Sequence, residues 1–314
     1  MKIGVVGCGF VGSASAYALV MQGICSELVL IDYNEKLAKA QAEDILHAVP
    51  FTHHVNIKTG NYADLEGCAI VMVAAGVNQK PGETRLDLLK RNTDIFAAII
   101  PEILKHAGDA VLLIATNPVD IMTQITVDIA HGLHAHPIEK IIGSGTILDT
   151  ARFRALIAKH FGIGNHSVHA YVLGEHGDSE VLHWSGIRIG SLDAETFSAQ
   201  RNVKITDTDR NEIDDNVRRA AYKIIEGKGA TYYGIGAGMA RIASAIIGNE
   251  KAVLTCSSPT GNFEELPQIS YSLPRIISAG GIEQSILPDL DKKEVSALQH
   301  SAETLFGFYN DLKK

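Results

Sequence analysis

The first half of the chain alternates short apolar runs with longer amphipathic segments. The apolar runs are rich in β-branched residues, which is typical of buried strands. They cover residues 2–7, 27–32, 69–76, 110–118 and 140–145. The segments with helical spacing of apolar residues cover 13–23, 35–48 and 85–108. This alternation predicts a doubly wound parallel sheet with short right-handed crossovers, which is an α/β fold.

The pattern changes after about residue 146. Amphipathic segments predict helices over 149–162, 209–227, 229–247 and 291–313. Apolar runs predict antiparallel strands over 251–258, 269–277 and 284–288, and 168–177 predicts a strand and then a loop. The last helix is expected to bury a face made of Val295, Leu298, Ala302, Leu305, Tyr309 and Leu312. We therefore predict two domains, 1–145 with the parallel sheet and 146–314 of α+β type.

The composition indicates a globular protein and excludes several functions. Hydrophobic residues make up 46% of the chain and charged residues 20%. The net charge of −8, with no cluster of lysines and arginines, argues against a nucleic-acid surface. The four cysteines are scattered and form no CxxC pair, so the sequence indicates neither a disulfide framework nor a zinc ribbon. This cysteine usage fits a reducing cytoplasm.

The uncharged stretch 3–26 resembles a signal peptide or a membrane span in its composition. It contains five glycines, and each would weaken a continuous apolar helix by about 1 kcal/mol relative to alanine. The glycines instead divide the stretch into a strand, a turn and a helix. We therefore predict neither a leader nor a membrane segment.

The run GCGFVG, residues 7–12, follows the first predicted strand and opens a helix. Gly7 allows a tight turn, Gly9 lets the backbone approach a pyrophosphate, and Gly12 lets helix and strand pack closely. Asp32 ends the next strand, where it would bind a ribose diol and repel a 2′-phosphate. The first domain is thus predicted to be of Rossmann type and to bind NAD. The predicted cofactor-binding residues are Gly7, Gly9, Phe10, Val11, Gly12, Asp32 and Asn117.

Polar residues gather where ligands bind in such sheets, beyond the carboxyl ends of the strands. Asn117 ends one strand, His176 lies in a glycine-flanked turn, and Arg85 ends a polar loop. Asp149 and Arg152 are three residues apart and share one side of a helix. A histidine can protonate a carbonyl oxygen, a buried carboxylate can fix its tautomer, and arginines can hold a carboxylate or polarise a carbonyl. These residue types suit hydride transfer to a 2-keto acid.

Six motifs carry a family resemblance that covers nearly the whole chain. They are GCGFVG, NQKPGETRLDLLKRN, ATNPVD, GSGTILDTARFR, LGEHGDSEVLHWSG and KGATYYGIG. Their order resembles the L-lactate dehydrogenases of the lactate/malate dehydrogenase family, of the bacterial type. The resemblance implies reversible hydride transfer between NADH and pyruvate, giving L-lactate. The segment 262–290 departs from the usual pattern of these proteins, which concerns an outer sheet.

The resemblance also implies a role for each site residue. His176 would be the proton donor and acceptor, and Asp149 its partner. The substrate carboxylate would be held by Arg152, while Arg85 would act from the loop as a catalytic and substrate-binding residue. Asn117 would bind substrate and Thr231 would line the pocket.

Gln79 lies in the polar loop 77–84, which can close over a substrate as a lid. The malate dehydrogenases of the family typically carry arginine at this position, where it pairs with a second carboxylate. Glutamine cannot neutralise that charge in a closed, dry site. Gln79 therefore indicates a monocarboxylate substrate, most simply pyruvate.

Some interpretations stay open. Arg154 and His169 resemble the positions where many bacterial members hold fructose 1,6-bisphosphate between subunits, but a surface arginine and a strand histidine explain them equally well. The histidines of HGLHAH, 131–136, lie without a carboxylate in a connecting loop, so we predict no metal site. The resemblance also implies a cytoplasmic homotetramer of glycolysis and fermentation, with allosteric control, although a dimer is not excluded. Malate or another 2-hydroxy acid is an alternative substrate, and an idle NAD-binding protein is an alternative function.

Overall fold

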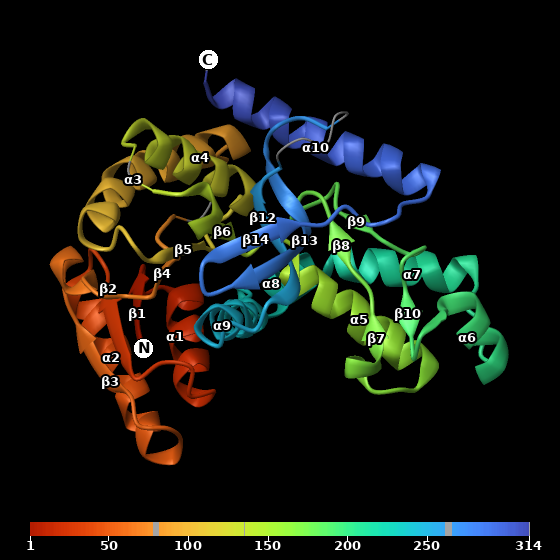
Figure 1. The fold of residues 1–314 in the computed structure, drawn as a ribbon, viewed down its shortest axis with the longest axis horizontal. Coiled ribbons are helices and arrows are strands. Elements are labelled where there is room, and N and C mark those ends of the chain that lie inside the picture. Colours follow the sequence, from red (N-terminus) through yellow and green to blue (C-terminus); the bar gives the residue numbers. More distant parts are fainter. Residues whose placement is uncertain (78–81, 135, 261–265, 314) are drawn as a thin grey trace.

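The central feature of the molecule is a sheet of nine strands, counted over the residues that the computed structural model describes, 1–77, 82–134, 136–260 and 266–313 (Figure 1). Six strands from the first half run parallel. They are β1 (Lys2–Val6), β2 (Glu27–Ile31), β3 (Asn56–Thr59), β4 (Ile70–Val73), β5 (Val111–Ile114) and β6 (Ile141–Gly143). Their order across the sheet is β6-β5-β4-β1-β2-β3. The chain adds strands on one side of β1 and then, from β4 on, on its other side, which is the topology of a doubly wound nucleotide-binding sheet.

Three strands from the second half extend the same sheet in antiparallel fashion beyond β6. They are β12 (Ala252–Pro259), β13 (Ser270–Ser278) and β14 (Gly281–Ser285). In one smaller sheet, β10 (Arg188–Ile189) lies between β7 (Val168–His169) and β11 (Leu192–Asp193), and in another β8 (Val172–Leu173) pairs with β9 (Val181–Leu182). The first half thus has the doubly wound α/β fold that the sequence predicts, and the second half combines helices with antiparallel strands, as the predicted α+β type requires. The boundary between 145 and 146 stays a prediction, because β6 and β12 belong to one sheet.

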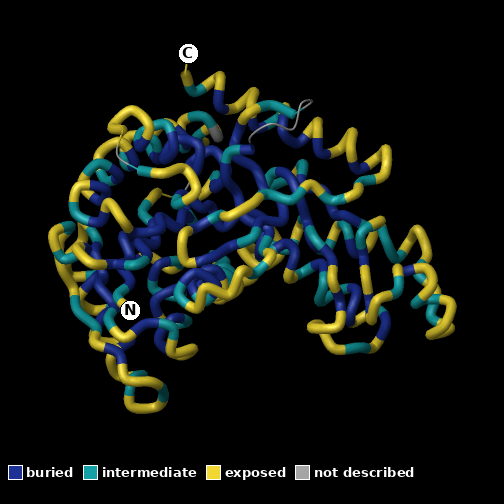
Figure 2. Tube along the Cα trace, viewed as in Figure 1, coloured by how far each residue is buried: buried dark blue, intermediate teal, exposed yellow. Residues whose placement is uncertain are grey.

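Helices cover both faces of the main sheet, and each face has its own apolar cluster. One cluster takes side chains from α3 (Arg85–His106), α4 (Val119–Gly132) and α10 (Lys292–Leu312). The other takes them from α1 (Phe10–Met21), α2 (Glu35–Ala48) and α9 (Tyr233–Ile247). The central strands are buried throughout, as the dark core of Figure 2 shows. Such burial on both faces explains their continuous apolar sequence.

A third cluster lies in the second half, under α5 (Ile147–Phe161) and α7 (Asp207–Arg218). Two further helices, α6 (Ala194–Arg201) and α8 (Ala220–Lys228), lie at the surface of this half. Among the described residues, we find no helix that is both long and apolar enough to cross a membrane.

Most predicted elements are present, and the differences have physical causes. The helix expected at 13–23 begins at Phe10, because the glycine loop leads directly into it, and ends before Gly23, which has a φ of +65°. The two helices expected at 209–227 and 229–247 are three, because the first is divided at Arg219 into α7 and α8; the expected break between them follows at Gly229, where φ is +80°. Strand β3 and helix α6 were not predicted, since both are short and largely polar.

The predicted buried face of the last helix is wrong at one position. Val295 is 43% exposed, whereas its neighbour Glu294 is buried. Leu298, Ala302, Leu305 and Tyr309 are buried as expected. The helix turns Glu294 inward because its carboxylate accepts hydrogen bonds from protein groups there, which we describe below.

Candidate active site

The GCGFVG loop has the backbone geometry that a dinucleotide requires. Gly7 has a φ of +97°, and a Cβ there would lie 2.4 Å from the backbone nitrogen of Ala75. A Cβ on Gly12 would lie 1.8 Å from the carbonyl oxygen of Gly7. Gly9, the N-cap of α1, offers open space above it and no capping side chain, so the first amides of α1 face the loop. These residues fit a pyrophosphate at the helix N-terminus.

Asp32 is held in place beside this loop. Its Oδ2 accepts a hydrogen bond from the amide of Cys8 at 2.7 Å, and its Oδ1 accepts one from the amide of Asn34 at 2.9 Å. The fourth residue of the loop, Phe10, is 63% exposed and stacks on Tyr232 with ring centroids 5.1 Å apart. Val11 is half-buried on α1. A fixed carboxylate next to the glycine loop is the arrangement that binds the adenosine ribose of NAD.

His176 and Asp149 form a close pair, although 27 residues separate them. The Nδ1–H of His176 donates to Oδ2 of Asp149 at 2.5 Å. Asp149 is buried in the first turn of α5, while the His176 side chain is 25% exposed. Burial lowers the pKa of His176, but the charge and hydrogen bond of Asp149 outweigh it and raise that pKa to about 9. The ring is therefore held as an imidazolium with Nε2–H left for a substrate.

The same carboxylate holds an arginine. Nη1 of Arg152 donates to Oδ1 of Asp149 at 2.8 Å, from one helical turn further along α5. Burial disfavours the ionised form of Asp149 and so raises its pKa, but the charges of His176 and Arg152 outweigh burial and keep this pKa below the ordinary value. Asp149 thus fixes both a proton donor and a cation.

Asp120 holds the backbone of His176 from the other side. It lies in the first turn of α4, is 1% exposed, and its Oδ2 accepts the amide N–H of His176 at 2.7 Å. Burial raises the pKa of Asp120 to about 6, although the hydroxyl of Ser257 and the amide of His176 lower it. Asp120 therefore ties the turn that carries Asn117 to the loop that carries His176.

A cavity of about 340 Å³ opens above these groups. The predicted site residues on its wall are Asn117, Asp149, Arg152 and His176. Apolar side chains from α3, α8 and α10 complete it, including Leu86, Ile225 and Phe308. The structure thus brings together four residues from three separate segments, at the carboxyl edge of the sheet.

Three predicted residues are not placed in this cavity. Gln79 lies outside the described residues, and only the backbone of Arg85, at the start of α3, is described. Thr231 precedes α9 and is not among the residues that line the cavity. The roles of these three residues stay predictions.

The two predicted effector residues lie away from the cavity. Nε of Arg154 donates to the carbonyl of Ala170 at 2.8 Å, and its guanidinium lies 4.9 Å from the ring centroid of Tyr171. His169 is exposed on β7 and pairs with Arg188 of β10. In the HGLHAH segment, Nδ1 of His136 bonds to the carbonyl of Gly108 at 2.9 Å. No group of three or more metal-ligating side chains occurs among the described residues.

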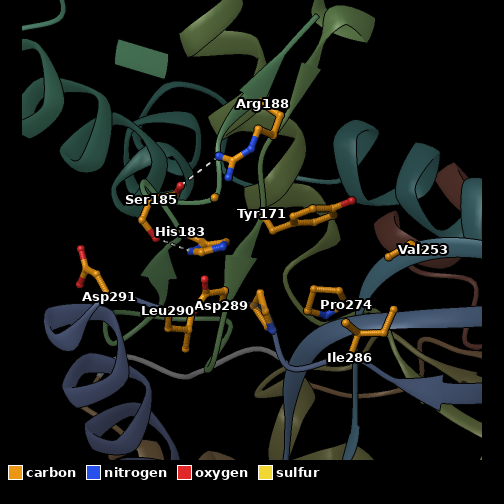
Figure 3. Close-up of a pocket in the computed structure, with 12 residues that line it drawn as sticks. Tyr171, His183, Ser185, Arg188, Val253, Pro274, Ile286, Asp289, Leu290 and Asp291 are labelled. Atoms are coloured by element: carbon orange, nitrogen blue, oxygen red, sulfur yellow. Dashed lines mark hydrogen bonds between the residues drawn. The ribbon is translucent and has the colours of Figure 1, made fainter. Parts of the chain in front are cut away.

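A second cavity, of about 560 Å³, lies between β10 and the start of α10 (Figure 3). His183 lies on its wall, and its Nδ1 bonds to Oε2 of Glu294 at 3.0 Å. Glu294 also accepts the amide and the hydroxyl of Ser185. The charged residues that line this cavity with His183 are Arg188, Asp289 and Asp291, all labelled in Figure 3. The glycine loop of the cofactor site contributes no residue to this cavity.

Comparison with known proteins identifies the family. The sequence model of the lactate/malate dehydrogenase NAD binding domain matches residues 1–143, and that of the lactate/malate dehydrogenase alpha/beta C-terminal domain matches residues 146–313. The chain belongs to the lactate/malate dehydrogenase family. It is an NAD-dependent oxidoreductase, as the sequence predicted.

Similar members of this family are L-lactate dehydrogenases. The one from Thermus aquaticus is 58% identical over 307 residues, which cover 98% of each chain. The one from Allorhizobium ampelinum is 54% identical over 97% of each chain. Among solved structures, a lactate dehydrogenase from a Medee basin deep-sea metagenome library has a TM-score of 0.95 at 38% identity, covering 100% of this chain and 99% of that one. The minor L-lactate dehydrogenase from Enterococcus mundtii gives 0.94 at 37% identity, covering 99% and 98%.

The sequence analysis missed three polar residues at the site. Asn92 is buried, donates to the carbonyl of Asn117 at 3.0 Å and accepts the amide of Val77 at 2.9 Å. Asp120 stands in the quoted motif ATNPVD, but no role was given to it. Glu180 lines the cavity and is 4% exposed. No local sequence signal separates these residues from ordinary surface polar groups.

Proposed function

We propose that this protein catalyses the NAD-dependent interconversion of pyruvate and L-lactate. The observation that carries the proposal is the double contact of Asp149, which bonds His176 through one oxygen and Arg152 through the other. An imidazolium and a guanidinium held side by side on a small cavity fit a 2-keto acid, which has one carbonyl and one carboxylate.

Each residue has a defined task in this reaction. NADH, when bound, supplies the hydride to the carbonyl carbon. His176 gives its Nε2 proton to the carbonyl oxygen, and Asp149 stabilises the imidazolium before that step. Nε and Nη2 of Arg152 make no hydrogen bond within the described part of the chain, so they are available to hold the substrate carboxylate. Arg85 polarises the carbonyl, and Asn117 and Thr231 contact the substrate.

Substrate choice is assigned to Gln79 on the sequence alone. An uncharged amide in the lid can pack against the methyl group of pyruvate. It would leave the second carboxylate of a dicarboxylate such as oxaloacetate without a partner, which is costly in a closed site. Initial rates of NADH oxidation with pyruvate, oxaloacetate and 2-ketoisocaproate test the proposal. We expect pyruvate to give the highest kcat/KM, and preference for oxaloacetate would favour the malate dehydrogenase alternative.

Gln79→Arg sharpens this test. The new guanidinium would pair with the second carboxylate of oxaloacetate, whereas with pyruvate it would be buried without a partner. If each effect is worth a few kcal/mol, the ratio of kcat/KM values should shift towards oxaloacetate by about 10³. A shift below tenfold would mean that Gln79 does not face the substrate.

Assembly and regulation are part of the same proposal. Exposed aromatic residues border a hollow between α1, α2 and α9, and a homotetramer would cover such a surface; they are Phe10, Tyr17, Phe51 and Tyr233. We assign fructose 1,6-bisphosphate to Arg154 and His169, between subunits. Lowering of the pyruvate KM by this effector, and loss of the response in Arg154→Gln, test the assignment. We further place the enzyme in the cytoplasm, in glycolysis and fermentation.

A further inference from the structure

Glu180 is a second carboxyl group in the active-site cavity, and the mechanism above does not use it. It precedes β9 directly and lines the same 340 Å³ cavity as Arg152 and His176. Its side chain is buried, and its Oε1 has no hydrogen-bond partner within the described part of the chain. A buried, unpaired carboxyl on a substrate cavity is costly in its ionised form.

The cations around Glu180 are engaged with other acceptors. Arg218 of α7 bonds Asp214 through Nε at 2.7 Å, and its Nη1 donates to the backbone carbonyls of Asp178 and Glu180 at 3.0 and 2.5 Å. Arg152 of α5 bonds Asp149. Neither arginine makes an ion pair with the Glu180 carboxylate among the described residues, so an ionised Glu180 would have no dedicated counter-ion.

The remaining groups near Glu180 do not replace that counter-ion. The loop before β9 brings His176, which is committed to Asp149, and the acidic residues Glu175 and Asp178. α8 brings Tyr222, whose hydroxyl donates to Asp178, and α10 brings only apolar side chains to the cavity. Burial, and then the charge of Asp149, raise the pKa of Glu180 to about 8, against the charges of Arg218, His176 and Arg152.

We propose that Glu180 carries a proton when the substrate binds, and that loss of this proton weakens binding of the substrate's carboxylate. The inference rests on the proposed function, because it takes a 2-hydroxy or 2-keto acid as the ligand. With Glu180 neutral, its side chain adds no negative charge beside the substrate carboxylate that Arg152 holds. An ionised Glu180 adds one negative charge to the same dry cavity and repels the substrate. Glu180 is thus a positioning and affinity-setting residue.

Oxidation of L-lactate separates this effect from the titration of His176. Lactate oxidation needs His176 as a proton acceptor, so its deprotonation gives a rising limb of kcat/KM with pH. Ionisation of Glu180 would give a falling limb at higher pH. The repulsion acts equally on the bound substrate and on the transition state. The fall in kcat/KM at high pH should therefore come from a rise in KM, while kcat at saturating lactate stays constant.

The experiment compares the parent, Glu180→Gln and Asp178→Asn from pH 7 to pH 10. Glutamine has the shape of the acid without its ionisation, whereas Asp178 is an exposed carboxylate at the rim of the same cavity. At each pH, kcat/KM for lactate in Glu180→Gln is divided by kcat/KM in the parent. We expect this ratio to rise at least tenfold from pH 7 to pH 10. The ratio for Asp178→Asn should change less than twofold. A Glu180→Gln ratio that is constant within twofold, or a fall that lies in kcat, overturns the inference.

A second measurement does not depend on the variant. L-Lactate binding to the enzyme–NADH complex, a pair that cannot react, is followed by calorimetry at pH 8.5 in buffers of different ionisation enthalpy. We expect the parent to take up more than half a proton on binding, and no proton uptake overturns the inference. Absence of lactate oxidation by the parent at every pH would instead contradict the proposed function, since the calorimetric result would still report on Glu180.

Discussion

The described part of the chain contains two histidine–carboxylate pairs, whose histidines are seven residues apart in sequence, and the pairs differ in what surrounds them. His176 bonds Asp149 at 2.5 Å on the wall of the 340 Å³ cavity, whereas His183 bonds Glu294 at 3.0 Å beside the second cavity. Asp149 shares its other oxygen with a cation, Arg152. Glu294 shares its oxygens with Ser185 and with the amide of Asp291, in the capping box of α10.

The difference shows that such a pair is not by itself a catalytic feature. In the first pair the carboxylate orients a proton donor and a guanidinium on the wall of the cavity that Asn117 also lines. In the second it satisfies a helix N-terminus and joins the start of α10 to the segment after β9. The predictions below change matched residues in the two pairs.

Substitution of the two histidines should give the largest difference. His176→Asn removes the proton donor, so kcat/KM for pyruvate should fall by about 10³ while NADH still binds. His183→Asn keeps a donor towards Glu294 and should retain activity within about threefold. Steady-state rates and NADH fluorescence titration check both variants. Equal losses in the two would show that the pairs do not differ in role.

The arginine near each pair provides the next contrast. Arg152→Lys keeps the charge but loses the planar fork, so the pyruvate KM should rise at least tenfold. Arg188→Lys, at the second cavity, should change it less than twofold, because within the described residues Arg188 donates only to the carbonyls of Ser185 and Ile187. A pyruvate KM in Arg152→Lys within twofold of the parent would remove Arg152 from the substrate site.

Glu294→Gln should affect stability rather than activity. Burial would raise the pKa of Glu294, but hydrogen bonds from His183 and Ser185 lower it from 4.5 to about 2. Since the folded pKa is below the unfolded one, the carboxylate stabilises the fold above pH 4.5, and this stability is lost as the pH falls towards 2. Allowing for solvent screening, we expect the variant to lose about 2 kcal/mol of unfolding free energy at pH 7.

Denaturant titrations at pH 7 and pH 3, at one protein concentration, measure that loss. The gap between parent and variant should be smaller at pH 3, because Glu294 is then largely protonated in the unfolded parent while it stays ionised in the folded parent. A gap that does not change with pH would mean that the charge of Glu294 contributes nothing.

The cofactor half could be predicted from sequence because its determinants are local. The glycine loop, α1 and Asp32 all fall within residues 7–32, and close backbone atoms require glycine at two positions of the loop, Gly7 and Gly12. Apart from β3, the strands of this half were predicted for the same reason, since burial on both faces leaves an uninterrupted apolar run.

The substrate cavity could be predicted only in part. The pairing of Asp149 with Arg152 follows from helical spacing, but the contact with His176 joins residues 27 apart and came from the family resemblance. Glu294 and His183 are 111 residues apart, and neither has a local signal. Glu180 was missed because an acidic residue after GDS is typical of a solvated loop, whereas packing of α7 and α8 buries it.

The central claim is that Asp149 keeps the proton on His176, and the pH dependence of kcat/KM for pyruvate at saturating NADH tests it most directly. In the parent the falling limb should be centred between pH 8 and pH 9, because the pKa of Glu180 is about 8 and that of His176 about 9. In Asp149→Asn the imidazolium loses its charged partner, so the limb should move towards the ordinary histidine value of 6.5. Glu294→Gln should leave it in place. A limb that stays above pH 8 in Asp149→Asn, even with reduced activity, would contradict the account.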